Sequence, residues 1–190
     1  MDVYEVLKRP LPKPTAEGYA SARLLEAITE AYIALRFIRD GLIRNAAEKA
    51  FQAWRALLAA LLRLELERLK TAARTEEEKR WLEEKAVPRV PTTRMKELSR
   101  LLEEAGYPDV SLWTSLALDL HDYQYHGPDP DVALSKYRTS KEAAYDVLKM
   151  AEGVLRCALE MRKEVKWDEE LETATSKLRE ELEKVKTSKH

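Results

Sequence analysis

The sequence predicts an all-α protein: an up-and-down bundle of four to five core helices, with an extra helical hairpin and a charged C-terminal helix. Helix-forming Ala, Leu, Glu, Lys and Arg dominate, whereas the 190 residues include only 5 Gly and 2 Phe. Apolar residues recur at steps of three and four along most of the chain, as they do on the buried face of a helix. A chain of this length is typical of one main domain.

The first elements are an arm and a long helix. Three prolines among residues 1–14 predict an extended N-terminal arm. A helix is expected at about 16–40, with Thr15 as its N-cap and Gly41 at its end.

The next predicted helix, at about 42–71, has an apolar stripe too wide for one neighbour. Its two adjacent apolar rows are rotated by about 100°, the turn of one residue. Such a helix is central to its own bundle, or it is shared with a second subunit. We expect a homodimer contact along the Ala-rich row, which comprises Ala46, Ala50, Ala53, Trp54 and Leu57.

Two further helices are expected in the middle of the chain. Thr75 and Glu78 have capping-box spacing and open the helical hairpin. This segment is expected to end before Pro88, because a residue that precedes proline avoids the α region. Another helix, at about 93–105, is expected to stop at Gly106.

Three predicted N-cap residues mark the starts of helices in the last part of the chain. Ser111 is the expected N-cap of a helix that breaks at Gly127. Asp129, followed by Pro130, predicts a helix that runs to roughly Lys163. Asp168 opens a final helix whose thin apolar edge predicts a tail that docks onto a partner or a partly frayed segment. The expected units are therefore the arm (1–14), the bundle domain (15–165) and a charged C-terminal helix or tail (166–190).

Composition indicates the compartment and the kind of source organism of the protein. The longest apolar stretch, Ala56 to Leu62, is far too short for a membrane span, and no signal peptide is expected. Cys157 is the only cysteine, which is typical of a cytoplasmic protein without disulfides. Scarce Asn and Gln beside abundant charged residues indicate a thermophilic source. A net charge of −1 predicts no bulk attraction to nucleic acid.

The usual catalytic motifs are missing from the sequence. It has no Gly-rich phosphate loop, no His-Glu-x-x-His and no Cys-x-x-Cys. Cys157 lies beside Val154 and Ala158 and is expected to be a buried, inert thiol. We therefore predict no catalytic residue, no metal and no cofactor.

Two segments resemble a known family. Residues 45–54 read Asn-Ala-Ala-Glu-Lys-Ala-Phe-Gln-Ala-Trp, and residues 120–130 read Leu-His-Asp-Tyr-Gln-Tyr-His-Gly-Pro-Asp-Pro. Both are similar to the archaeal PaREP repetitive-element proteins, relatives of the HEPN (higher eukaryotes and prokaryotes nucleotide-binding) superfamily. The resemblance implies an archaeal, HEPN-like, often dimeric bundle with a polar site near the end of its third core helix. It also implies a nucleotidyltransferase as a possible partner.

Many HEPN proteins are toxins that cut RNA with an Arg, four to six intervening residues and a His. His126 stands at the histidine position, but the stretch 101–135 contains neither Arg nor Lys. Metal-independent RNA cleavage needs a cation beside the scissile phosphate as well as a base. We therefore interpret this chain as non-enzymatic.

The densest polar and aromatic cluster lies before Gly127. Asp119, Asp122 and His126 share one helical face, whereas His121 and Tyr125 share another. These five residues form the candidate cleft. Three interpretations stay open: a small-ligand or nucleotide site, a divalent metal held by the Asp/Asp/His face, and a structural cluster of mutually satisfied side chains.

A basic segment supplies candidate phosphate contacts. These are Arg89, Arg94, Lys96 and Arg100, opposed between residues 85 and 100 only by Glu97. Pro88 and Pro91 are expected to hold the segment extended, so that it contacts phosphates or serves as a solvated linker.

The leading hypothesis is a dimeric, HEPN-like binding protein for a nucleotide, a nucleic acid or a nucleotidyltransferase. One alternative is a HEPN-type ribonuclease or toxin whose basic residue comes from another element or subunit. A second alternative is a structural module that displays its C-terminal helix to another protein.

Overall fold

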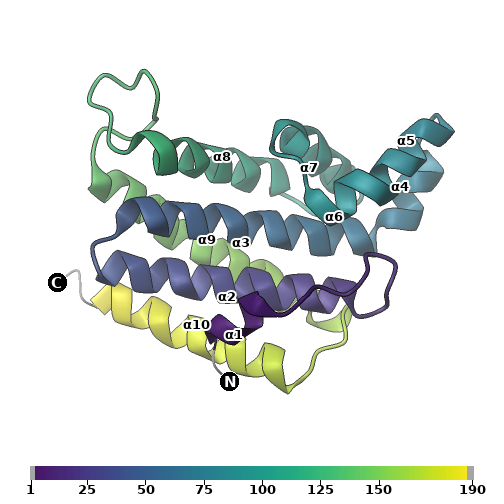
Figure 1. Ribbon diagram of the computed structural model, residues 1–190, viewed down its shortest axis with the longest axis horizontal. Helices are drawn as coiled ribbons and strands as arrows, with labels where there is room; N and C mark the ends of the chain where they lie inside the picture. The colour runs from purple at the N-terminus through teal and green to yellow at the C-terminus, as the bar shows by residue number, and fades with distance from the viewer. Residues whose placement is uncertain (1–2, 188–190) are drawn as a thin grey trace.

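A computed structural model of the protein describes residues 3–187, and every regular element in that range is helical (Figure 1). The long helices are α2 (Tyr19–Arg39), α3 (Ile43–Leu64), α8 (Val110–His126), α9 (Ser140–Glu160) and α10 (Glu169–Thr187). The shorter elements are α1 (Val3–Lys8), α4 (Leu66–Ala72), α5 (Glu76–Trp81), a π-helical turn (Leu82–Ala86), α6 (Val87–Arg89), a 3-10 turn (Thr92–Arg94), α7 (Met95–Glu104) and a second 3-10 turn (Met161–Lys163). The predicted all-α class is confirmed. No helix within residues 3–187 has the length and apolar character of a membrane span.

The five long helices form the bundle. In Figure 1, α8, α3, α2 and α10 follow one another from top to bottom, and α9 passes behind α3 and α2. Helix α3 packs against α2, α8 and α9, and α10 packs against α2 and α9. The short helices α4 to α7 form a lobe at the end of α3, at the right of Figure 1. The predicted bundle with an extra helical segment is thus confirmed.

Helix α3 is the centre of its own bundle. Ala46, Ala53 and Leu57 are completely buried, and so is the Trp54 side chain, whose indole N–H donates a 2.9 Å hydrogen bond to Thr114 of α8. Ala50 is also buried. The row expected to contact a second subunit is therefore covered by the chain's own helices. Of the two alternatives drawn from the wide stripe, the homodimer contact along this row is the wrong one.

Several predicted helix ends are confirmed. The side chain of Thr75 accepts a 3.1 Å hydrogen bond from a backbone N–H in the first turn of α5, and Asp168 accepts one of 2.9 Å at the start of α10. Gly41 and Gly106 follow the ends of α2 and α7 with φ of 75° and 105°. Only glycine adopts this left-handed conformation at no steric cost, so both positions end their helices.

Two expected N-caps are wrong, and so is the fully extended arm. Helix α2 begins at Tyr19 instead of beside Thr15, and the described part of the arm contains α1. Residues 1–2 lie outside the described residues. Ser111 lies inside α8, where its backbone N–H and its hydroxyl donate to the Glu103 carboxylate at 2.8 and 2.7 Å.

The helix predicted from Asp129 begins instead at Ser140. The Asp129 carboxylate accepts a 2.6 Å hydrogen bond from the backbone N–H of Leu134, so it stabilises a loop. The true N-cap is Thr139, which forms a reciprocal capping box with Glu142.

Pro88 does not hold an extended segment, contrary to the prediction. It lies in the first turn of α6, whose helical backbone suits the fixed φ of proline. The π-helical turn leads directly into α6. The chain turns only afterwards, at Val90, which has a φ of 40°.

The C-terminal helix is docked within the chain. Its apolar edge, Leu171, Leu178, Leu182 and Val185, is buried, and α10 packs mainly on α2. Buried Glu181 of α10 forms a 2.7 Å ion pair with Arg39 of α2. The edge that we expected to be frayed or free for a partner is therefore occupied by α2.

Helix α9 approaches α8 closely at Gly153. A Cβ atom at this position would lie 2.8 Å from the Trp113 ring. The ring is confined, because the Trp54 ring lies 6.2 Å away and the Arg156 guanidinium 5.3 Å away. We expect Gly153→Ala to destabilise the protein by about 1 kcal/mol and at most about 2 kcal/mol, because overpacking costs roughly 1–3 kcal/mol and the gain in helix propensity offsets about 1 kcal/mol of this cost. Urea unfolding followed by circular dichroism measures this change.

The same substitution in a Trp113→Leu background is the control. Removing the ring removes the clash, so Gly153→Ala should then be neutral or stabilising. Equal destabilisation in both backgrounds would show that the close approach is not the cause.

Candidate functional site

One side of the end of α8 is an aromatic cluster. The His121 ring stacks on Phe51 of α3 with centroids 4.2 Å apart, and the Tyr125 ring meets it edge-on at 5.2 Å. Burial lowers the pKa of His121, and nearby Arg55 lowers it further, against the opposing effect of Asp122. The imidazole is therefore neutral at pH 7.

The other side of α8 is acidic. Burial and the neighbouring Asp122 raise the pKa of Asp119. Tyr137, from the loop before α9, donates a 2.8 Å hydrogen bond to Asp146, and burial raises the pKa of both groups.

The five residues of the predicted cleft therefore do not converge. His121 and Tyr125 face α3, Asp119 lies within the electrostatic reach of Asp146 in α9, and His126 is exposed at the helix end. Among residues 3–187, no group of three or more His, Cys, Asp and Glu is arranged to hold a metal ion.

A guanidinium does reach the end of α8. Arg44, at the start of α3, donates from Nε to the carbonyl oxygen of Gln124 at 2.9 Å and from Nη2 to that of Tyr125 at 2.6 Å. These carbonyls lie in the last turn of α8, where a cation also meets the negative end of the helix dipole. The sequence stretch around the end of α8 contains no arginine, as the sequence analysis stated. In the folded chain, however, Arg44 of α3 supplies one, so the prediction that this helix end lacks a guanidinium is wrong.

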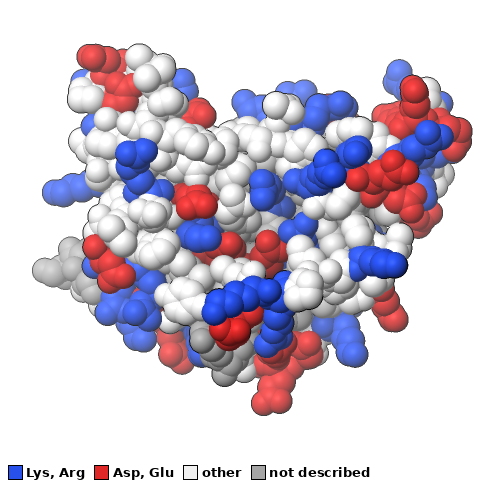
Figure 2. Space-filling model, viewed as in Figure 1, with Lys and Arg blue, Asp and Glu red and all other residues white. Residues whose placement is uncertain are grey.

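The predicted phosphate contacts are dispersed. Arg94 forms an ion pair with Glu97, and its guanidinium lies 4.4 Å from the centroid of the Trp81 ring. Lys96 and Arg100 are exposed on α7. Arg89, at the end of α6, lines a cavity. Figure 2 shows basic side chains over the region where α3, α6 and α7 meet.

That cavity is lined by three arginines from three helices. Arg23 of α2, Arg55 of α3 and Arg89 of α6 surround a space of about 310 Å³, and Ala59, Pro88 and Val90 complete its wall. We call it the arginine pocket.

Arg23 is fixed in place. Its Nε donates to the Tyr19 hydroxyl at 2.9 Å, Nη1 to the Glu26 carboxylate at 2.8 Å and Nη2 to the Pro88 carbonyl at 2.7 Å. The last of these bonds ties α6 to α2, and this is what brings Arg89 to the pocket.

Arg55 forms no direct ion pair. Among the residues that the structure describes, no carboxylate lies within ion-pair distance of it, and its guanidinium carbon lies 5.9 Å from the centroid of the Phe51 ring. Burial lowers the pKa of Arg55, and the charge of Arg23 lowers it further, whereas the more distant carboxylates of Glu26 and Glu30 oppose this shift. The protein therefore holds a partly desolvated positive charge in this pocket.

Two of the three pocket residues escaped the sequence analysis. Arg23 and Arg55 lie on the two helices that were interpreted only as packing elements. One signal was present: Arg55 is the only charged residue between Ala50 and Leu62. A single charged residue in an otherwise buried helical segment indicates either an ion-pair partner elsewhere in the chain or a ligand-binding site.

Cys157 is half-buried in α9, and burial raises the pKa of its thiol to about 11. At pH 8 only about one thiol in a thousand is then ionised, and the thiolate is the reactive form. We expect iodoacetamide to modify Cys157 at least tenfold more slowly in the native protein than in urea, as measured by mass spectrometry over time.

A Cys157→Ala, Ser176→Cys variant, whose new thiol is on the exposed face of α10, is the matched control and should react at the same rate in both conditions. Equal native and unfolded rates at Cys157 would contradict the burial of this thiol.

Together, the fold and the pocket define an all-helical bundle protein with an arginine-lined cavity where α2, α3 and α6 meet. The chain belongs to the archaeal PaREP1/PaREP8 family, whose profile matches residues 22–148 of 190. The predicted PaREP resemblance is thereby confirmed. The matched segment includes all three arginines of the pocket. No curated protein and no solved structure is detectably similar to the chain.

Proposed function

We propose that this protein is a binding protein for a ligand with a terminal phosphate, either a nucleotide or a nucleic-acid end, and that the arginine pocket holds the phosphate. The observation that carries the proposal is that the partly buried Arg55 guanidinium forms no direct ion pair, because Glu26 and Glu30 act on it only from beyond ion-pair distance. A phosphate would supply a direct counter-ion. Its bond to a partly desolvated guanidinium would be stronger than a bond to a solvated one.

The three arginines suit different parts of this task. Arg23 is fixed by its hydrogen bonds and contributes a positive field. Arg55 and Arg89 have no carboxylate partner within the described range, so their donors remain for a ligand. A guanidinium donates two parallel hydrogen bonds and therefore matches phosphate geometry.

The size and charge of the site favour a small phosphate group over a long duplex. The pocket of about 310 Å³ is at the lower end of ligand cavities. The net charge of −1 supplies no general attraction to a polyanion. Recognition would then depend on one phosphate and on the groups next to it.

Arg55→Met tests the proposal. We expect the affinity for 5′-AMP and for a 5′-phosphorylated RNA oligonucleotide to fall about tenfold to hundredfold, because hydrogen bonds to charged groups contribute roughly 1.5–3 kcal/mol. Isothermal titration calorimetry at two salt concentrations measures the change. The stability of the variant should be equal to that of the wild type or higher, because a charge without a direct ion pair leaves a partly buried position.

Arg179→Met, on the exposed surface of α10, is the matched control and should bind as the wild type does. An Arg55→Met variant with unchanged affinity for both ligands would refute the proposal. So would a wild type that binds the unphosphorylated oligonucleotide as well as the phosphorylated one.

One observation favours the HEPN-type ribonuclease as a second candidate. Arg44 reaches the helix end that carries His121 and His126, so a basic residue is supplied from another element. Its Nε and Nη2 donors, however, are used on backbone carbonyls. A phosphate would have to displace at least one of these bonds.

We expect the purified wild type to leave single-stranded RNA intact in the absence of added metal, because these donors of Arg44 are occupied. Gel electrophoresis of a labelled oligonucleotide tests this. Cleavage that is lost in both His126→Ala and Arg44→Ala but retained in Arg179→Met would establish the ribonuclease instead. Growth arrest on expression, relieved by His126→Ala, would support the same conclusion.

A further inference from the structure

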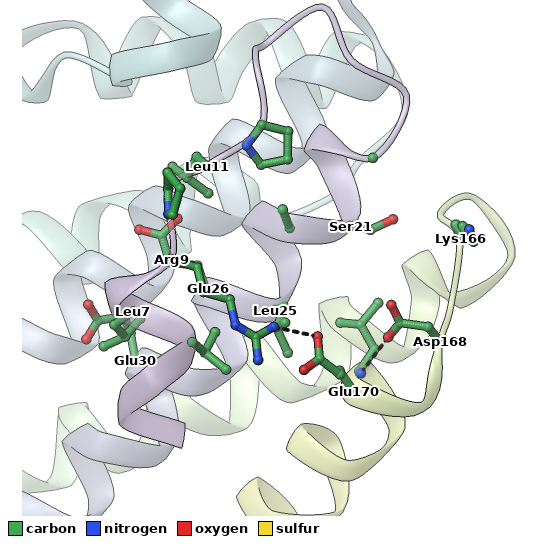
Figure 3. Close-up of a pocket in the computed structure, with 16 residues that line it drawn as sticks. Leu7, Arg9, Leu11, Ser21, Leu25, Glu26, Glu30, Lys166, Asp168 and Glu170 are labelled. Atoms are coloured by element: carbon green, nitrogen blue, oxygen red, sulfur yellow. Dashed lines mark hydrogen bonds and ion pairs between the residues drawn. The ribbon is translucent and has the colours of Figure 1, made fainter. Parts of the chain in front are cut away.

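A second cavity lies along α2, next to the arginine pocket, and the Arg23–Glu26 ion pair joins their walls. It is bounded by the N-terminal arm, by α2 and by the segment that leads into α10, and it has a volume of about 560 Å³. Figure 3 shows this cavity, with Leu7 and Leu11 of the arm on one side and Glu170 of α10 on another. A volume of this size is typical of small-molecule sites.

Much of the cavity wall is apolar. Leu7 and Leu11 come from the arm, Leu25 from α2 and Leu171 from α10. These side chains offer an environment for an apolar body and supply no hydrogen bonds. Charged groups on the rest of the wall must therefore determine the orientation of a ligand.

The charged groups of the wall are predominantly acidic. They comprise four carboxylates, Glu26, Glu30, Asp168 and Glu170, and two cations, Arg9 and Lys166, so the charge of the lining is −4 + 2 = −2. Arg9 is already paired with Glu170 at 2.8 Å, and Asp168 caps α10. Glu26 and Glu30, on the α2 side, have no cation among the lining residues, because their partners, Arg23 and Lys49, lie outside the lining.

Glu30 has spare capacity for a cation. Only 7% of this residue is exposed. Lys49 donates a hydrogen bond of 3.3 Å to Oε1 of Glu30. The Lys49 Nζ also lies 3.1 Å from Oε2, but the angle is unsuitable for a hydrogen bond. Within the described residues, Oε2 therefore accepts no hydrogen bond. Glu26, one turn earlier, uses Oε2 to pair with Arg23 at 2.8 Å. Glu26 and Glu30 thus line the same cavity from one side of α2, and the buried Oε2 of Glu30 lacks a hydrogen bond that a cationic donor would supply.

The arm that lines the cavity is held at two places. Helix α1 packs on α2, and its Val6 side chain is buried in the core. The link to α10 is the Arg9–Glu170 ion pair, in which the side chains are 52% and 40% exposed. Exposed pairs of this kind contribute about 0–1 kcal/mol, so this second link is the weak one.

We propose that this cavity binds a small amphipathic cation, an ammonium or guanidinium group on an apolar body, with the cation at Glu26 and Glu30 and the apolar body against the leucines of the arm. The site is separate from the arginine pocket and does not depend on the proposed phosphate ligand. Charge complementarity selects a cation, and the apolar wall selects against small hydrated ions.

Titration calorimetry with the full-length protein and four probes tests the proposal. The probes are 2-phenylethylammonium, hexylammonium, and their uncharged counterparts 2-phenylethanol and 1-hexanol. We expect both ammonium probes to bind at least tenfold more tightly than the alcohols.

Two variants locate the binding. Glu30→Gln should weaken ammonium binding at least tenfold, and Ala22→Phe should abolish it, because Ala22 lines the cavity and a phenyl ring would fill it. Glu30 is preferred to Glu26 because Glu26 also orients Arg23. Glu77→Gln, on the exposed surface of α5, is the matched control and should bind as the wild type does. Circular dichroism verifies that each variant is folded.

Three outcomes would overturn the inference. These are equal affinity for ammonium and alcohol probes, no binding of any probe at millimolar concentration, and ammonium binding that is unchanged in a folded Ala22→Phe variant. Because the phosphate ligand is titrated separately, failure here leaves the arginine pocket untouched, and the reverse also holds.

Discussion

The burial of α3 is the constraint on which the rest of the structure depends. Between Ala50 and Leu62 only Gln52 and Arg55 retain partial exposure. A helix with so wide an apolar surface needs neighbours on several sides, so α2, α8 and α9 close around it. Its alanines permit close packing, and Arg55 is consequently held in a partly desolvated position. The feature that stabilises the bundle is thus also the one that creates a charged site.

Arg23 connects this core to the lobe formed by α4 to α7. Its hydrogen bond to the Pro88 carbonyl, together with the one from Tyr19 to the Val87 carbonyl at 3.2 Å, fixes α6 against α2. Carbonyls near the end of α6 lack partners within that short helix, so side chains of α2 supply them. A contact that satisfies backbone groups therefore also positions Arg89. The arginine pocket is a consequence of how the lobe is attached.

Two cavities of opposite character adjoin each other along α2. Arg23 lines the arginine pocket, and its ion-pair partner Glu26 lines the acidic cavity beneath the N-terminal arm. A single ion pair between residues three apart thus divides a cationic site from an anionic one. The chain can in this way present two recognition sites with a net charge of only −1.

By itself, the sequence determined the helical class, the number of core helices and those boundaries that depend on local chemistry. Thr75, Asp168, Gly41 and Gly106 act within one turn of their own helix, so their effects are readable from neighbouring residues. The start of α9 was mispredicted because Asp129 had two local options, and its carboxylate bonds to a loop. Tertiary structure alone decided the rest. It buried the α3 stripe within one chain, brought Arg44 to the end of α8, and gathered Arg23, Arg55 and Arg89 from three helices. Helical periodicity specifies which face of a helix is apolar, but it does not specify which neighbour covers that face, and long-range encounters between charged side chains depend on that choice.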